Sequence, residues 1–215
     1  AGKTTVFNML TGVYKPTEGN IVLDGNDITG ATPEAISKAG IARTFQNIRL
    51  FAEMTALENV MVGRHIRTQS GLFGAVLRTK KFKAEEAAIA KRAQELLDYV
   101  GIGKYADYKA RTLSYGDQRR LEIARALATD PQLIALDEPA AGMNATEKVQ
   151  LRALIDQIRN DNRTILLIEH DVKLVMGLCD RVTVLDYGKQ IAEGTPATVQ
   201  KNDKVIEAYL GTGGH

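Results

Sequence analysis

Two apolar runs, residues 133–136 and 164–168, constrain the fold of this chain most. Each has the length of a buried strand and is apolar on both faces, and stretches with helical periodicity alternate with them. A strand of this kind needs helices on both sides of its sheet, because both of its faces must be removed from water. The alternation therefore predicts an α/β fold with a mainly parallel sheet flanked by helices.

Polar side chains follow both runs directly, at the sheet edge where open α/β folds place their ligands. Asp137 and Glu138 come after the first run. Adjacent residues on a strand point in opposite directions, so we expect the two carboxylates to have different roles. Asp137 is a candidate to hold Mg²⁺, directly or through water, and Glu138 is a candidate general base for an attacking water. The alternative is an acidic turn that only ends a strand.

His170 follows the second run in the same way. A histidine at this edge can donate a hydrogen bond to a γ-phosphate oxygen, whereas a lone histidine is more often structural. His65 and His215 have no such context, and we interpret them as surface residues. Gln46 follows a predicted strand over residues 41–45, where a neutral amide can contact both a metal ion and an attacking water.

The chain begins Ala-Gly-Lys-Thr-Thr, and its Gly-Lys-Thr matches the second half of the phosphate-binding loop G-x-x-x-x-G-K-[ST]. In such a loop Gly2 lets the backbone approach a phosphate closely. Lys3 reaches the β- and γ-phosphates, and the Thr4 hydroxyl holds Mg²⁺. Because Gly-Lys-Thr is common, an ordinary exposed segment is the alternative. A second candidate anion site is Ser114 with Gly116, ahead of a predicted helix, although a plain helix cap also explains them.

Local signals predict the other elements. We expect a capped helix at Asn144, with Glu147 completing a capping box. Further helices are expected over residues 3–11, 55–64, 84–100 and 171–178, after Gly116, and from Pro33, Pro196 and Asp203; further strands over 20–23, 181–186 and 190–193.

Composition narrows the class of protein. The chain has 215 residues, 44% of them hydrophobic, which suits one α/β domain over residues 1–215 with a helical subdomain near 53–125. Its net charge of +2 implies no strong attraction to nucleic acid. Cys179 is its one cysteine, which excludes an internal disulfide. No apolar run is long enough to span a bilayer.

Taken together, these segments resemble the ATP-binding subunits of ABC transporters, which have a P-loop NTPase fold. The matching segments are residues 2–5 (end of the Walker A loop), 45–47 (Q-loop), 113–120 (signature), 133–139 (Walker B), 141–144 (D-loop) and His170 (H-loop). Within the family, the chain is most similar to the larger ATPase subunit of branched-chain amino-acid importers. Residues 43–46, 70–73, 169–176 and 205–211 carry that likeness. Tyr115 stands where most relatives have glycine.

The resemblance implies an ATPase with ATP and Mg²⁺ as cofactors. Its implied catalytic residues are Glu138, His170 and Gln46; its nucleotide-binding residues are Gly2, Lys3, Thr4, Thr5, Ser114, Gly116 and Asp137; its metal ligands are Thr4, Gln46 and Asp137. The first glycine of the Walker A loop would precede Ala1. We therefore expect a chain truncated within that motif, without the upstream strands, and inactive by itself.

The resemblance also implies partners and a location. Two homologous ATPase subunits would pair head to tail, so that Ser114 and Gly116 serve the nucleotide of the partner. The pair would dock on two membrane-spanning permease subunits at the cytoplasmic face of the plasma (inner) membrane, and a periplasmic or extracellular binding protein would deliver the cargo. The basic insertion over residues 65–83 is a candidate contact with the permease or the lipid surface, or else a solvated loop.

Three alternatives to this function remain open. The same ATPase could serve another cargo, such as urea, short amides or lipopolysaccharide. It could be a soluble ABC-type ATPase that acts on nucleic acid or ribosomes, although such proteins usually show tandem cassettes or long coiled-coil insertions. It could be a non-catalytic structural partner, against which Glu138 and His170 argue.

Overall fold

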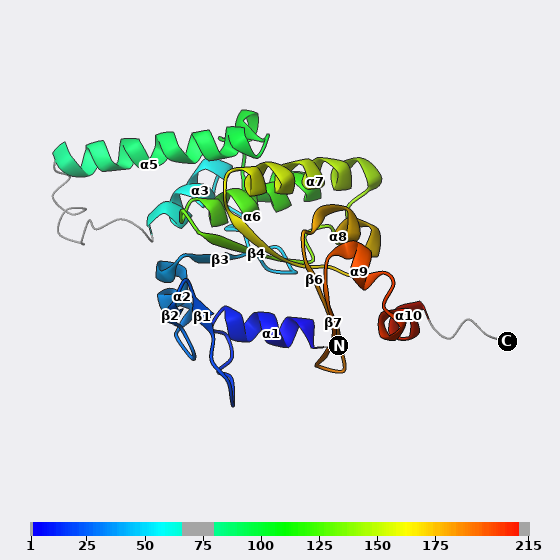
Figure 1. Cartoon of the computed structure of the whole chain (residues 1–215). Coiled ribbons are helices and arrows are strands. Elements are labelled where there is room, and N and C mark those ends of the chain that lie inside the picture. Colours follow the sequence, from blue (N-terminus) through cyan, green and yellow to red (C-terminus); the bar gives the residue numbers. More distant parts are fainter. Residues whose placement is uncertain (1, 66–79, 211–215) are drawn as a thin grey trace. The chain divides into compact units, whose positions relative to one another are not determined.

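The computed structural model describes residues 2–65 and 80–210 (Figure 1). The chain forms two compact units. The first unit contains residues 1–33 and 167–215, and the second contains residues 34–166. Most of the predicted insertion over residues 65–83 lies outside the described residues. Among the described residues, no helix combines the length and the apolar character that crossing a bilayer requires.

The sheet of the second unit has the strand order β3-β4-β5 within the described residues, with β3 spanning Ile41–Arg43, β4 Leu133–Asp137 and β5 Thr164–Ile168. Strands β3 and β4 pair in parallel, with Ile41 opposite Leu133. On the other side of β4, the N–H of Thr164 donates to the carbonyl of Gln132 at 3.0 Å. The side chains at 134–136 are fully buried. This arrangement confirms the parallel sheet that the apolar runs predicted.

Helices α3 (Ala56–His65), α5 (Lys80–Tyr99) and α6 (Tyr115–Leu127) pack against one another in the second unit (Figure 1). Helix α6 also contacts β3. Leu121, Ala124 and Leu127, at helical spacing on α6, are completely buried. The helix begins where the sequence signals it, because the Ser114 hydroxyl accepts a hydrogen bond from the N–H of Asp117.

Helix α7 (Ala145–Asn160) confirms the predicted capping box. The Asn144 side chain accepts from the N–H of Glu147, and the Glu147 carboxylate accepts from the N–H of Asn144, each at 2.9 Å. Both of these N–H groups would otherwise lack a partner at the start of the helix. The remaining elements of this unit are η1 (Gly103–Tyr105), η2 (Ala110–Thr112) and all but the first residue of α2 (Pro33–Ala39).

The first unit is built around an antiparallel hairpin of β6 (Val182–Asp186) and β7 (Lys189–Gly194). Helix α9 (Pro196–Val199) packs on both strands, and α10 (Asp203–Leu210) packs on β7. Val184, Val199 and Val205 form their shared core. The other elements of this unit are α1 (Lys3–Leu10), the β1–β2 hairpin (Val22–Leu23 and Asn26–Asp27) and α8 (Val172–Leu178).

Strand β3 is shorter than the predicted strand over residues 41–45. The ladder ends with the N–H of Thr44, which donates to the carbonyl of Ala135 at 2.9 Å. From Phe45 onward the backbone bonds to side chains of α6 instead of to β4. The predicted strand therefore ends early because a neighbouring helix supplies its hydrogen-bond partners.

Candidate functional site

Gly2 gives the start of helix α1 a conformation that other residues rarely adopt. It caps the helix with φ 98°, in the region that glycine reaches without a steric cost. A Cβ at this position would lie 2.9 Å from the Cα of Gly188 in the β6–β7 turn. The sequence therefore needs glycine here both for the positive φ at the start of the helix and for the close approach of Gly188.

Lys3 lies beside the carboxyl end of strand β5 within the first unit. Its ammonium group donates to the backbone carbonyl of Glu169 at 3.3 Å. The buried Glu169 carboxylate in turn accepts from the N–H of His170 at 3.2 Å. The structure thus brings Lys3 next to the segment that carries His170. The side chains of Thr4, Thr5 and His170 are exposed and can be reached by a ligand.

Asp137, in the second unit, is the buried carboxylate at the end of β4. It is 3% exposed, and its Oδ2 forms an ion pair with Arg43 Nη2 at 3.3 Å. Burial raises the pKa of Asp137, while the positive charge of Arg43 opposes that rise. Sequence reasoning did not identify Arg43 as part of this site. Its position directly opposite Ala135 in the parallel register puts it next to the end of β4.

Glu138 leaves the strand in a left-handed backbone conformation. Its φ is 46°, a region that costs a residue with a side chain about 1 to 3 kcal/mol and that often occurs at functional sites. Its Oε2 accepts a hydrogen bond from Gln46 Nε2 at 2.9 Å. Asp137 and Glu138 have different partners, and their different roles stay a prediction. The predicted reason, strand alternation, is wrong, because β4 ends at Asp137 and the turn redirects Glu138.

The loop that carries Gln46 is bound by two charged residues of α6. Arg119 and Glu122 are each 2% exposed and pair at 3.1 Å. Arg119 donates to the carbonyls of Phe45 and Gln46, and Glu122 accepts from the N–H groups of Phe45 and Arg49. Burial raises the pKa of Glu122, and the adjacent Arg119 guanidinium acts in the opposite direction. Sequence reasoning missed both residues, although two charges at helical spacing on the inward face of α6 were a readable signal.

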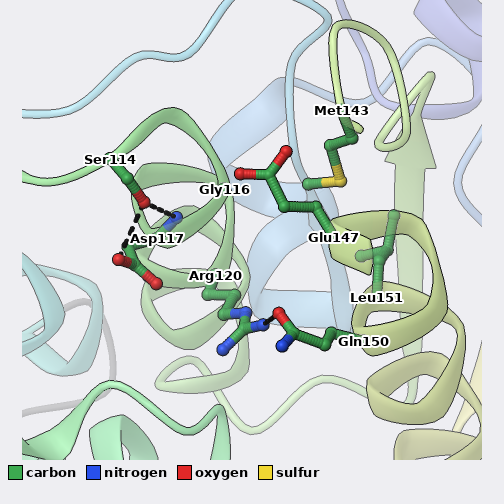
Figure 2. A pocket seen from close by; sticks show the side chains of 8 residues that line it. All are labelled: Ser114, Gly116, Asp117, Arg120, Met143, Glu147, Gln150 and Leu151. Carbon is green, nitrogen blue, oxygen red and sulfur yellow. Dashed lines mark hydrogen bonds between the residues drawn. The ribbon is translucent and has the colours of Figure 1, made fainter. Parts of the chain in front are cut away.

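Ser114 and Gly116 line a pocket of about 190 Å³ at the start of helices α6 and α7 (Figure 2). The Ser114 hydroxyl donates to the Asp117 carboxylate at 2.8 Å. A Cβ on Gly116 would lie 2.7 Å from Glu147 Oε1. The absence of a side chain thus lets an acidic group approach the amino end of α6. Gln46, Asp137 and Glu138 are not part of this pocket's lining.

The predicted metal ligands Thr4, Gln46 and Asp137 offer hydroxyl, amide and carboxylate oxygens. Magnesium prefers such hard oxygen donors and usually takes few protein ligands, with water and phosphate completing its shell. The oxygen donor of each of these residues therefore suits magnesium by its chemistry. The described residues contain no cluster of three or more acidic, histidine or cysteine side chains that could hold a metal ion alone.

Comparison with known proteins identifies similar sequences over nearly the whole chain. A family model described as "ABC transporter" matches residues 1–141, and one described as "Branched-chain amino acid ATP-binding cassette transporter" matches residues 189–215. The high-affinity branched-chain amino acid transport ATP-binding protein LivG of Escherichia coli K12 is 49% identical over 212 residues. The match covers 98% of this chain and 83% of LivG.

Two solved structures share the fold. The ADP conformation of MJ1267, an ATP-binding cassette of an ABC transporter, has a TM-score of 0.81 and 31% identity, covering 98% of this chain and 84% of that chain. The dimeric post-hydrolysis state of the ATP-binding cassette MJ0796, bound to ADP and Pi, has a TM-score of 0.74 and 26% identity, covering 91% and 81%.

Proposed function

This chain belongs to the ABC transporter family, and from that premise we propose that it is the ATP-hydrolysing subunit that energises import of branched-chain amino acids. Its α/β P-loop NTPase fold, predicted from the sequence, is confirmed by the similar cassettes. The cargo is carried over from LivG-type relatives, whose similarity extends over nearly the whole chain. The observation that carries the enzymatic part of the proposal is the contact between Gln46 and Glu138.

Glu138 is the general base of this proposal. Its carboxylate is the acceptor of the Gln46 amide, so an oxygen that can take a proton from water is held at the edge of the sheet. Gln46 is neutral and can orient the attacking water without changing the charge of the site. Arg43 balances the neighbouring carboxylate of Asp137 and so reduces the repulsion between Asp137 and Glu138.

The phosphate-binding roles fall to Gly2, Lys3, Thr4 and Thr5. The amino end of α1 presents unpaired N–H groups, and Lys3 adds a full positive charge next to them. His170 donates to a γ-phosphate oxygen. Thr4, Gln46 and Asp137 would hold Mg²⁺, which when bound neutralises negative charge on the phosphates.

Ser114 and Gly116 serve the nucleotide of a second, homologous ATPase subunit in this proposal. Helix α6 supplies the partial positive charge of its amino end to that nucleotide. The dimer of MJ0796 with ADP and Pi supports the idea that cassettes of this kind work in pairs.

The proposed assembly contains this chain, a second ATPase subunit and two permease subunits, with a periplasmic or extracellular protein that delivers the amino acid. The chain is then peripheral, at the cytoplasmic face of the inner membrane, and does not bind nucleic acid. We further propose that residues 1–215 act as one ATPase domain in which residues 53–125 form a helical subdomain. Helices α3 and α5 lie within that range, and so does α6 except for its last two residues; the three helices contact one another.

The test is an ATPase assay on the chain with its phosphate loop completed, co-purified with its second ATPase and its permease. We expect Glu138→Gln to lower kcat by about 100-fold or more, the loss typical of a missing general base, while nucleotide binding is retained. Glu95→Gln is the matched control, since Glu95 is an exposed glutamate that forms an ion pair with Arg92 on its own helix. Equal activity of wild type and Glu138→Gln would refute the catalytic role.

The cargo is tested separately in proteoliposomes that contain the same complex. Leucine, isoleucine or valine, presented with the binding protein, should stimulate ATP hydrolysis and accumulate inside. Stimulation by urea or a short amide alone would reassign the cargo and leave the ATPase assignment intact.

A further inference from the structure

The buried ion pair of Arg119 and Glu122 connects helix α6 to the loop that carries Gln46. Both side chains lie on the same face of α6, three residues apart, and both are 2% exposed. Removing two charges from water is costly, and apolar residues of similar size often stabilise a fold equally well. A buried pair at this position therefore calls for an explanation beyond core packing.

The hydrogen bonds of the pair go to backbone groups of one short loop. Arg119 Nη1 donates to the carbonyl oxygen of Phe45 at 2.6 Å, and Nη2 donates to the carbonyl oxygen of Gln46. Glu122 Oε1 accepts from the N–H groups of Phe45 at 3.3 Å and Arg49 at 3.4 Å. The ion pair thus binds both N–H and carbonyl groups of this loop. One of these groups belongs to Gln46, whose side chain contacts Glu138.

The same arginine reaches toward the start of α6. Arg119 Nη2 donates to the hydroxyl of Tyr115 at 3.1 Å, and its guanidinium lies over the Tyr115 ring, 5.5 Å from the centroid. Tyr115 is the neighbour of Ser114, and its ring Cε1 would lie 3.3 Å from a Cβ on Gly142. A single side chain therefore joins the amino end of α6 to the backbone of Gln46.

We propose that Arg119, supported by Glu122 and Tyr115, is a positioning residue that holds Gln46 in place against Glu138. This inference rests on the proposed function, because it assigns Arg119 a role in the same hydrolysis step. It links the segment around Ser114, which serves the partner's nucleotide, to the general base of this chain's own site. Arg119 touches neither nucleotide nor water in this proposal and acts through the loop.

The decisive experiment is a double-mutant cycle in the purified complex, with kcat and KM for MgATP measured for each variant. Lysine keeps the charge of Arg119 but carries its donors on one nitrogen, so it does not reproduce the planar fork whose two nitrogens bind separate acceptors. We expect Arg119→Lys to lower kcat by about 10- to 100-fold, the loss expected from a misplaced catalytic group, with KM changed by no more than about 2-fold. In a Gln46→Ala background, the same substitution should change kcat by no more than about 2-fold, because nothing remains to be positioned.

Arg159→Lys is the matched control. Arg159 also pairs with a carboxylate three residues away, Asp156, but on the more exposed surface of α7. The Arg159→Lys substitution should leave kcat and KM unchanged. If the fold-loss in kcat of the double variant equalled the product of the two single-variant losses, the two residues would act independently and the proposal would be overturned. An Arg119→Lys variant with wild-type kcat would overturn it as well.

Tyr115→Phe keeps the test decisive if Arg119→Lys fails to fold. This substitution removes one hydroxyl from a side chain that is 43% exposed, so it spares the core. We expect kcat to fall by about 2- to 10-fold, the size of one hydrogen bond, and this fall to vanish in the Gln46→Ala background. A failure of the proposed function itself would look different, since wild type would then be inactive or Glu138→Gln would remain active.

Discussion

Gln46 Nε2 donates a hydrogen bond of 2.9 Å to Glu138 Oε2, although the two residues are 92 positions apart in the chain. The loop after β3 and the turn after β4 bring them together, because parallel neighbouring strands present their carboxyl ends at one edge of the sheet. The contact orients a carboxylate that has left its strand in a left-handed conformation. The pairing of β3 with β4 therefore positions the proposed general base.

The identity of residue 46 should determine the rate of hydrolysis. Gln46→Glu would place a second carboxylate next to Glu138, and like charges at this distance repel. We expect Gln46→Glu to lower kcat by about 10- to 100-fold, and by more than Gln46→Ala, which only removes the amide. Steady-state ATPase assays of the assembled complex measure both. Higher activity in Gln46→Glu than in Gln46→Ala would show that the neutral amide is not required.

The capping box of α7 should contribute measurably to stability. Asn144→Ala removes the side-chain acceptor for the N–H of Glu147, and we expect the free energy of unfolding to fall by about 1 kcal/mol. Thr146→Ala, an exposed position in the same first turn, is the control and should change stability by less than about 0.5 kcal/mol. Urea denaturation followed by circular dichroism compares the two. Equal effects of both substitutions would mean that the cap is not a specific contribution.

Glu122 should make stability depend on pH. Because burial raises its pKa in the folded state above the ordinary value of 4.5, the folded state binds the proton more tightly than the unfolded state. Its stabilising contribution is then complete below pH 4.5 and is lost as pH rises through the raised pKa. The charged groups that act on this carboxylate are Arg119 and Arg125.

Denaturant titrations of wild type and Glu122→Gln across that pH range test this expectation. The difference in unfolding free energy between the two proteins should shift in favour of Glu122→Gln as pH rises from about 4.5. A difference that moves the other way would show that Arg119 lowers the pKa of Glu122 more than burial raises it.

Local patterns in the sequence predicted most of the helices and strands and supplied the candidate site residues, whose roles stay predictions. Strand β5 begins and ends as predicted, because polar residues bound its apolar run on both sides, but of its five side chains only Ile168 is buried. The start of α7 followed from Asn144 and Glu147, whose contacts are three residues apart and depend on no other part of the chain. Lys3, Glu138 and His170 were identifiable because each sits at a fixed offset from a strand or helix end.

The distant partners of the buried charged side chains were decided only by the tertiary structure. Arg43 meets Asp137, and Arg119 and Glu122 bind the loop at residues 45–49, through contacts between segments 73 to 94 positions apart. A buried charge is tolerated only where specific partners surround it, and no local pattern shows which distant backbone groups will be there. The sequence by itself determined which residues could do the chemistry, through short-range periodicity and capping. Only tertiary packing decided which partners position these residues. Those contacts depend on the register of β3 against β4 and on the packing of α6 beside β3.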